Sequence, residues 1–141
     1  MSKFSKKLFH CWHPVAYSHE VPLDAPYGST LLNEALVVWR TSDGVPHAMQ
    51  DLCIHRGTAL SKGRLKDDCV VCPYHAWHYN AEGACVKIPQ KVDSTQVPSK
   101  ARVPVYRTLE RYGLIWVALE DPMFSLPELP ELEEETWKIV L

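Results

Sequence analysis

Short apolar runs rich in β-branched and aromatic residues alternate with turn-forming residues along most of the chain. Runs of this length and composition are typical of β-strands. The pattern predicts extended segments at residues 12–17, 30–32, 36–40, 47–50, 70–71, 77–79, 103–107 and 114–119. Asp43-Gly44, residues 80–83 and residues 111–113 have the composition of turns between such segments. No apolar repeat of a helix longer than one or two turns accompanies them, so the sequence predicts an all-β fold.

Length, composition and charge narrow the class of protein. A chain of 141 residues with 46% apolar residues is typical of one globular domain. Its net charge of −2 gives no reason to expect binding to nucleic acid. Residues 114–119 form the longest apolar stretch near the C-terminal end and are too few to span a bilayer. No apolar segment follows the lysines near the N-terminus, so we expect no secretory signal, no membrane partner and a cytoplasmic location.

Four residues are candidates for metal binding: Cys53, His55, Cys72 and His75. They form the pairs C-I-H and C-P-Y-H, which are separated by 16 residues. Each pair offers one thiolate and one imidazole, so two loops that meet at their tips can hold two metal atoms. A Rieske [2Fe–2S] centre has this ligand set, with two Cys on one iron and two His on the other. The order Cys then His in both pairs fits that demand.

The residues around these pairs, and further motifs within residues 12–119, also match a known family of domains. The first loop reads D-L-C-I-H-R-G-T (residues 51–58) and the second reads V-C-P-Y-H-A-W (residues 71–77). The chain resembles the Rieske domain of non-haem iron oxygenases, and the vanillate-demethylase and phenoxybenzoate-dioxygenase-like branch is the most similar. Further matching motifs are W-H-P-V-A (12–16), G-R-L (63–65), N-A-E-G-A-C-V (80–86), I-P-Q (88–90) and Y-G-L-I-W-V (112–117).

This resemblance implies a fold and a set of roles. The expected fold is an antiparallel β sandwich with a smaller cluster-binding subdomain of two loops. Cys53 and Cys72 would hold the buried iron, and His55 and His75 would hold the outer iron with their imidazole edges near solvent. The residues expected around the cluster are Arg56, Gly57, Tyr74 and Trp77.

The resemblance also implies partners. The cluster would take one electron at a time from an NAD(P)H-dependent reductase or a ferredoxin and pass it to a mononuclear Fe(II) in a catalytic domain. In the family that iron has a 2-His-1-carboxylate triad. No such pattern follows the cluster loops in this sequence, and His78 is its last histidine. We therefore expect no oxygenation by this chain alone. The full-length form is expected to be a homotrimer, in which His75 approaches a carboxylate of a neighbouring subunit's catalytic domain.

The composition changes after residue 119. Residues 121–135 contain three prolines and six acidic residues, and the apolar stretch W-K-I-V-L follows at residues 137–141. An acidic, proline-rich run buries little by itself. We expect residues 1–119 to form the Rieske domain and residues 120–141 to be a linker toward an absent catalytic domain.

Two other functions remain open. A freestanding Rieske ferredoxin would have the same ligands, but it would have no use for the linker and its apolar end. A structural zinc module is the second alternative, because Cys₂His₂ is a common zinc ligand set. Zinc fingers, however, usually pair like ligands with like, whereas each loop here is mixed.

Several other Cys and His residues imitate ligand spacings. Cys11 and His13 repeat the C-x-H spacing, but they have no matching second pair, so we expect ordinary strand residues. Cys69 and Cys72 form a CxxC outside the βαβ context of thioredoxins, and Cys69 is expected in the core. His78 is expected at the surface.

The loops also bear on the reduction potential. High-potential respiratory Rieske proteins have a disulfide between the loops and a serine hydroxyl bonded to a cluster sulfur. The corresponding positions here are Thr58, Tyr74 and Trp77. Fewer hydrogen bonds to sulfur predict a low potential, near the bottom of the Rieske range of about −150 to +300 mV.

Overall fold

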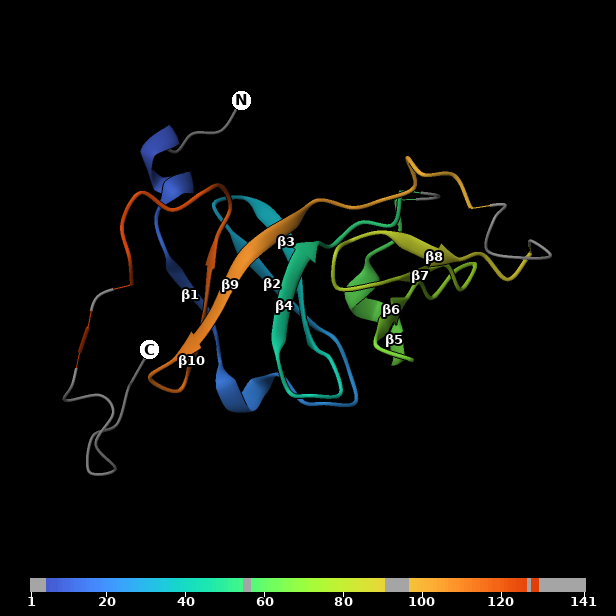
Figure 1. Ribbon diagram of the computed structural model, residues 1–141, viewed down its shortest axis with the longest axis horizontal. Coiled ribbons are helices and arrows are strands. Elements are labelled where there is room, and N and C mark those ends of the chain that lie inside the picture. The colour runs from blue at the N-terminus through green and yellow to red at the C-terminus, as the bar shows by residue number, and fades with distance from the viewer. Residues whose placement is uncertain (1–4, 55–56, 91–96, 127, 130–141) are drawn as a thin grey trace.

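The computed structural model describes residues 5–54, 57–90, 97–126 and 128–129. These residues form ten β-strands and three short 3₁₀ helices, which confirms the all-β prediction (Figure 1). No helix in these ranges is long and apolar enough to cross a membrane. The elements are η1 (Lys6–His10), β1 (His13–Tyr17), η2 (Ser18–Glu20), β2 (Tyr27–Leu31), β3 (Glu34–Arg40), β4 (Pro46–Gln50), η3 (Leu60–Lys62), β5 (Arg64–Lys66), β6 (Cys69–Val71), β7 (His78–Tyr79), β8 (Cys85–Lys87), β9 (Val105–Arg111) and β10 (Leu114–Ala118).

Six strands form a large antiparallel sheet in the order β1-β10-β9-β4-β3-β2. The sheet curls so that its two edges meet, and the hydroxyl of Ser29 on β2 donates to the carbonyl of Val15 on β1 (3.0 Å). The first core fills the inside of this sheet, and its buried residues are Ala16, Val21, Leu31, Leu36, Val38, Ala48, Ile115 and Val117.

Four short strands form a second antiparallel sheet in the order β5-β6-β7-β8. Figure 1 shows this small sheet beside β3 and β4, at the opposite end from the β9–β10 hairpin. β3 supplies both cores, because Leu36 and Val38 face the first core while Val37 and Trp39 face the second. A strand buried on both faces needs a continuous apolar run, which explains L-V-V-W in β3.

The small subdomain is therefore more than the two loops expected from the sequence. Two glycines let its strands approach their neighbours. A Cβ at Gly63 would collide with the carbonyl of Val71, and one at Gly83 would collide with the carbonyl of Val103. Gly83 also has a φ of +79°, which side chains disfavour. The G-R-L and N-A-E-G motifs thus have a packing reason.

The described part of residues 120–129 packs against the domain. The amide of Glu120 donates to the carbonyl of Phe9 (2.9 Å), and the amide of Met123 donates to that of His10 (2.9 Å). Leu126 is buried, and the amide of Leu129 donates to the hydroxyl of Tyr112. The boundary at residue 119 stays a prediction, and residues 137–141 lie outside the described residues.

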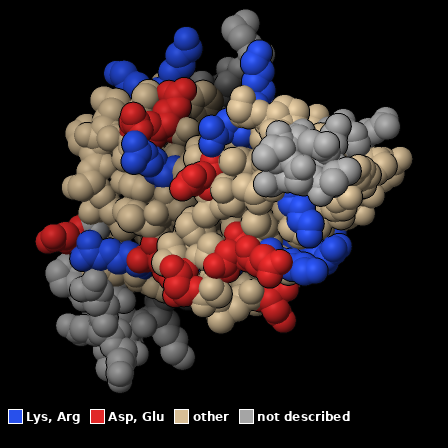
Figure 2. Space-filling view, turned by 45° about the vertical axis from the view of Figure 1, so that its right-hand side comes forward, with Lys and Arg blue, Asp and Glu red and all other residues tan. Residues whose placement is uncertain are grey.

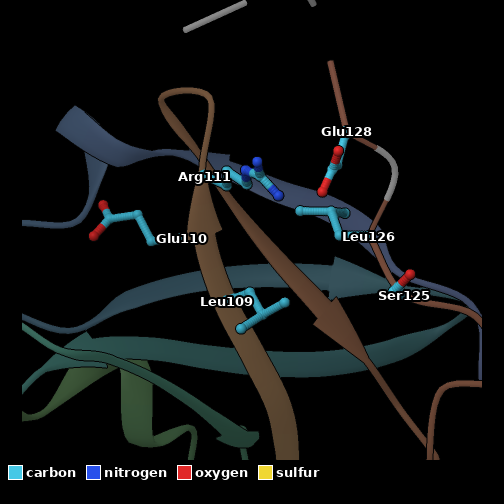
Figure 3. Close-up of a pocket in the computed structure, with 6 residues that line it drawn as sticks. All are labelled: Leu109, Glu110, Arg111, Ser125, Leu126 and Glu128. Carbon is cyan, nitrogen blue, oxygen red and sulfur yellow. The ribbon is translucent and has the colours of Figure 1, made fainter. Parts of the chain in front are cut away.

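A pocket of about 490 Å³ lies between this segment and β9. Figure 3 shows the Arg111 side chain directed toward Leu126 and Glu128, with Leu109 below them. The remaining lining residues are Glu110 and Ser125. The pocket belongs to the β9–β10 end of the molecule, far from the two ligand loops in Figure 1, so we do not connect it with the metal centre.

Candidate metal centre

The first ligand loop connects β4 to η3 and is anchored by Asp51. The Asp51 amide donates to the carbonyl of Ala35 (3.0 Å), and its carboxylate accepts from the amide (2.7 Å) and the hydroxyl of Ser61. Within the loop, the amide of Cys53 donates to the carbonyl of Thr58 (2.8 Å) and the amide of Gly57 donates to that of Cys53 (2.7 Å). Asp51 thus ties the start of the loop to η3.

The second ligand loop connects β6 to β7 and has the same hydrogen bonds. The amide of Cys72 donates to the carbonyl of Trp77 (2.9 Å), and the amide of Ala76 donates to that of Cys72 (3.0 Å). Both loops need a positive φ four residues after the cysteine, at Gly57 (+70°) and Ala76 (+58°). The two loops therefore make one type of turn, although the spacing from Cys to His differs.

The two turns bring Cys53 and Cys72 together inside the second core. Their side chains are buried, with 0% and 1% of their surface exposed, and neither is in a disulfide. Burial raises the pKa of the Cys72 thiol, and a hydrogen bond with Cys53 raises it further. The backbone amides of Tyr74 and His75 donate to the Cys72 sulfur and act in the opposite direction, because they stabilise a thiolate.

Tyr79 adds a donor that the sequence analysis missed. Its side chain is fully buried, and its hydroxyl lies 3.2 Å from the Sγ of Cys53. Burial and the contact with Cys53 both raise the pKa of Tyr79 far above its usual value, so the hydroxyl keeps its proton. Tyr79 follows a ligand loop by two residues, but only the register of β7 shows that it points at the other loop's cysteine.

His75 lies at the tip of the second loop. The ring of Tyr74 packs edge-on against its ring, with centroids 4.2 Å apart, and its Nε2 atom is buried. The side-chain amide of Gln90 donates to the carbonyl of His75 (3.1 Å), so the I-P-Q segment holds this loop. His55 and Arg56, the other predicted ligand and its neighbour, lie outside the described residues.

Other predicted neighbours have distinct surroundings. Trp77 packs partly buried against the second core, whereas Tyr74 is 62% exposed. His78 was expected at the surface, which is wrong: it is buried in β7, and its Nδ1 hydrogen-bonds with the carbonyl of Ala76 (2.8 Å).

The cysteines and the histidine that only imitate ligand spacings, Cys69, Cys11 and His13, have other surroundings. Cys69 is buried, as expected. Cys11 follows η1 instead of lying in a strand, and its thiol donates to the carbonyl of Lys7 (3.4 Å). His13 Nε2 hydrogen-bonds with the carbonyl of Leu8 (2.9 Å). These contacts give Cys11 and His13 a structural role in the η1 segment.

The donors present fit a [2Fe–2S] cluster. Two adjacent buried thiols, with amide and hydroxyl donors directed at their sulfurs, suit the negative charge of an iron–sulfur group. Among the described residues, no group of three or more His, Cys, Asp or Glu side chains could hold a metal ion. A Rieske cluster needs only two protein side chains on each iron, and His55 is not among the described residues.

The comparisons with known proteins agree with this chemistry. The model of the Rieske [2Fe–2S] domain family matches residues 11–107, and the chain belongs to this family. The chain therefore binds a [2Fe–2S] cluster, and its function is one-electron transfer.

Several relatives are named as oxygenases or demethylases. Methylxanthine N1-demethylase NdmA of Pseudomonas putida is 41% identical over 128 residues, which cover 87% of this chain and 36% of NdmA. The toluene-4-sulfonate monooxygenase system iron-sulfur subunit TsaM1 of Comamonas testosteroni is 36% identical over 84% of this chain and 33% of its own length. This chain thus spans about a third of the length of these curated relatives.

Solved structures show the same fold. The structure of NdmA superposes with a TM-score of 0.84 at 36% identity, covering 92% of this chain and 41% of that one. Dicamba monooxygenase with non-heme iron and dicamba superposes with a TM-score of 0.81 at 30% identity, covering 91% of this chain and 39% of that one.

Proposed function

We propose that Cys53, His55, Cys72 and His75 hold the cluster, with both cysteines on one iron and both histidines on the other. The observation that carries the proposal is the pair of equivalent turns that bring Cys53 and Cys72 together in the core. The bound cluster supplies a one-electron redox couple. The residues of this chain exclude water from the sulfurs, donate hydrogen bonds to them and hold His75 at the loop tip.

Four described residues near the cysteines have a part in this function: Tyr74, His75, Tyr79 and Gln90. The amides of Tyr74 and His75 and the hydroxyl of Tyr79 donate toward the cysteine sulfurs, which favours the more negative, reduced state. Gln90 fixes the backbone of His75. Because Tyr74 beside it is exposed, the tip of the second loop is the proposed exit for electrons.

Single substitutions test the ligand assignment. Cys72→Ser should abolish the Rieske EPR spectrum and lower the iron and acid-labile sulfide content, which should be two of each per chain in the unmodified protein. Cys69→Ser is a matched control, because Cys69 is a buried cysteine of the same sheet. His55→Cys and His75→Cys should change or abolish the spectrum. An unchanged spectrum in any ligand variant would contradict the assignment.

We further propose that the chain acts as the N-terminal electron-transfer domain of a cytoplasmic, homotrimeric oxygenase component. An NAD(P)H-dependent reductase or ferredoxin would be the donor, and a catalytic domain with mononuclear Fe(II) would be the acceptor. The support is that relatives about three times as long are named as monooxygenases and demethylases. Mixed with a reductase, NADH and aromatic methyl ethers, the chain should show cluster reduction without product. Product formed by this chain alone would refute the proposal.

A further inference from the structure

One face of the small sheet carries three basic residues that the cluster does not use, beside the buried Val71 and His78. Arg64 on β5 pairs with Val71, and Val71 pairs with His78. His78 pairs with Lys87 on β8 next to an irregularity in the register, and the charge of Lys87 acts on His78. Residues directly opposite each other on paired strands point to the same face of a sheet. Lys66 lies two residues after Arg64 and shares that face. Arg64, Lys66 and Lys87 are exposed, and we call them the basic face.

The three positive charges all lie close enough to His78 to affect its pKa. Burial lowers the pKa of His78, and the charges of Lys87, Arg64 and Lys66 lower it further, against the hydrogen bond with Ala76. Within the described part of the chain, no salt bridge neutralises any of the three. By contrast, the guanidiniums of Arg40 and Arg107 are paired with carboxylates.

Two acidic residues border the basic face. Asp67 and Asp68 form the turn between β5 and β6. The carboxylate of Asp68 is directed at Ser42, whose amide and hydroxyl donate to it (2.8 and 3.1 Å). Figure 2 shows Lys and Arg side chains at several places on the molecule; one group lies on the right-hand side, with acidic side chains below it and to its left.

The basic face adjoins the second ligand loop. β6 ends at Val71, immediately before Cys72, and β7 begins at His78, immediately after Trp77. The paired residues Val71 and His78 therefore flank the loop that carries two of the proposed ligands, Cys72 and His75. A protein seated on this face would come close to the cluster, which electron transfer requires.

We propose that the basic face is the docking surface for an acidic iron–sulfur protein of the ferredoxin type that reduces the cluster. The proposal rests on the electron-transfer function and adds the surface and the charge of the donor. In each encounter the ferredoxin loses one electron and the Rieske cluster gains it, and no bond forms or breaks. Cations that form no salt bridge among the described residues, on a molecule of net charge −2, attract an acidic partner to this face in particular and speed its association.

Stopped-flow reduction of the cluster-loaded full chain tests the proposal. The donor is a reduced acidic plant-type [2Fe–2S] ferredoxin, and photoreduced 5-deazariboflavin serves as an uncharged donor. The test variant combines Arg64→Gln, Lys66→Gln and Lys87→Gln. The control variant removes the same number of Lys and Arg charges elsewhere, through Lys6→Gln, Lys7→Gln and Arg107→Gln.

At low ionic strength, the test variant should react with ferredoxin at least about tenfold more slowly than the unmodified chain, and the control variant should stay within about twofold. Added salt should slow the unmodified chain and have little effect on the test variant. Reduction by deazariboflavin should be equal in all three proteins.

Four results would overturn the proposal. Equal slowing of both variants would show that only net charge matters, and a salt-independent rate in the unmodified chain would exclude steering by any charged surface. If ferredoxin is slow but deazariboflavin is fast in every protein, the electron-transfer function stands and the docking proposal fails. If neither donor reduces the cluster, the function itself fails and the docking proposal fails with it.

Discussion

Tyr79→Phe should lower the midpoint potential of the cluster. The substitution keeps the buried ring and removes the hydroxyl 3.2 Å from the Sγ of Cys53. A sulfur bound to iron as thiolate can only accept, so the hydroxyl donates. The reduced cluster carries one more negative charge than the oxidised one and accepts the stronger hydrogen bond. Loss of the donor therefore destabilises the reduced state more, and the potential falls.

The size of this shift follows from hydrogen-bond energies. Neutral hydrogen bonds contribute about 0.5–1.5 kcal/mol and those to charged groups about 1.5–3 kcal/mol, so the two redox states differ by about 1 kcal/mol. For one electron, 59 mV corresponds to a factor of ten, or about 1.4 kcal/mol. The expected fall is therefore about 40 mV.

Protein-film voltammetry measures this shift directly. Tyr106→Phe is the control, because Tyr106 packs against the first core, away from the cysteines, and should leave the potential unchanged. Iron and sulfide content should be equal in all samples. A rise in potential, or no change with full cluster content, would show that the Tyr79 hydroxyl does not donate to the cluster sulfur.

Three further predictions concern stability. Ala76→Gly should raise the free energy of unfolding by about 0.5–1 kcal/mol in denaturant titrations, because relief of the left-handed strain outweighs the extra freedom of glycine in the unfolded chain. Arg40 lowers the pKa of Glu110 by a hydrogen bond. The pair therefore contributes stability above the pKa of Glu110 in the unfolded chain, and this stability is lost as the pH falls through the lower pKa of the folded protein. In Glu110→Gln, the melting temperature should fall less as the pH is lowered over this range than it does in the unmodified chain. A chain without residues 120–141 should have a free energy of unfolding lower by about 1.5–3 kcal/mol, because the burial of Leu126 is lost. A chain that ends at residue 129 keeps Leu126, so its free energy of unfolding should equal that of the full chain.

The central strands could be predicted because their burial pattern is local. The run in β3 is apolar on both faces, and it packs against both cores. The turn at Asp43-Gly44 follows from the conformational preference of glycine, which has a φ of +85° there. The cysteine pair could be predicted for a different reason, since the chemistry of a mixed cluster demands one Cys and one His from each loop.

β5 and β8 could not be predicted from local pattern. Each has three residues, and R-L-K and C-V-K carry too few apolar positions to indicate a strand. They form because β6 and β7 offer free edges for pairing and because Gly63 and Gly83 permit close approach. These are interactions between distant segments, which a single run of residues does not reveal.

The same reason explains why the expectation for His78 was wrong and why the role of Tyr79 was missed. Both follow the second ligand loop, and alternation assigns them to opposite faces of β7 without showing what covers either face. Pairing with Val71 and Lys87 buries His78, and pairing with Val70 turns Tyr79 into the second core. The low potential expected from Thr58, Tyr74 and Trp77 remains a prediction, and the Tyr79 hydroxyl acts against it.

The two ligand loops show how different sequences reach one geometry. C-I-H-R-G-T and C-P-Y-H-A-W place the histidine at different distances from the cysteine, yet the amide four residues after each cysteine returns to that cysteine's carbonyl. The first loop uses Gly57 for the required positive φ, whereas the second tolerates Ala76 there. A non-glycine residue persists in this conformation only where its surroundings hold it. Here the amide of Cys72 bonds to Trp77 and Gln90 bonds to His75, so the second loop is fixed on both sides of the strained residue. That rigidity suits the role proposed for His75, since a histidine that holds the cluster must stay in one position while the charge on the cluster changes.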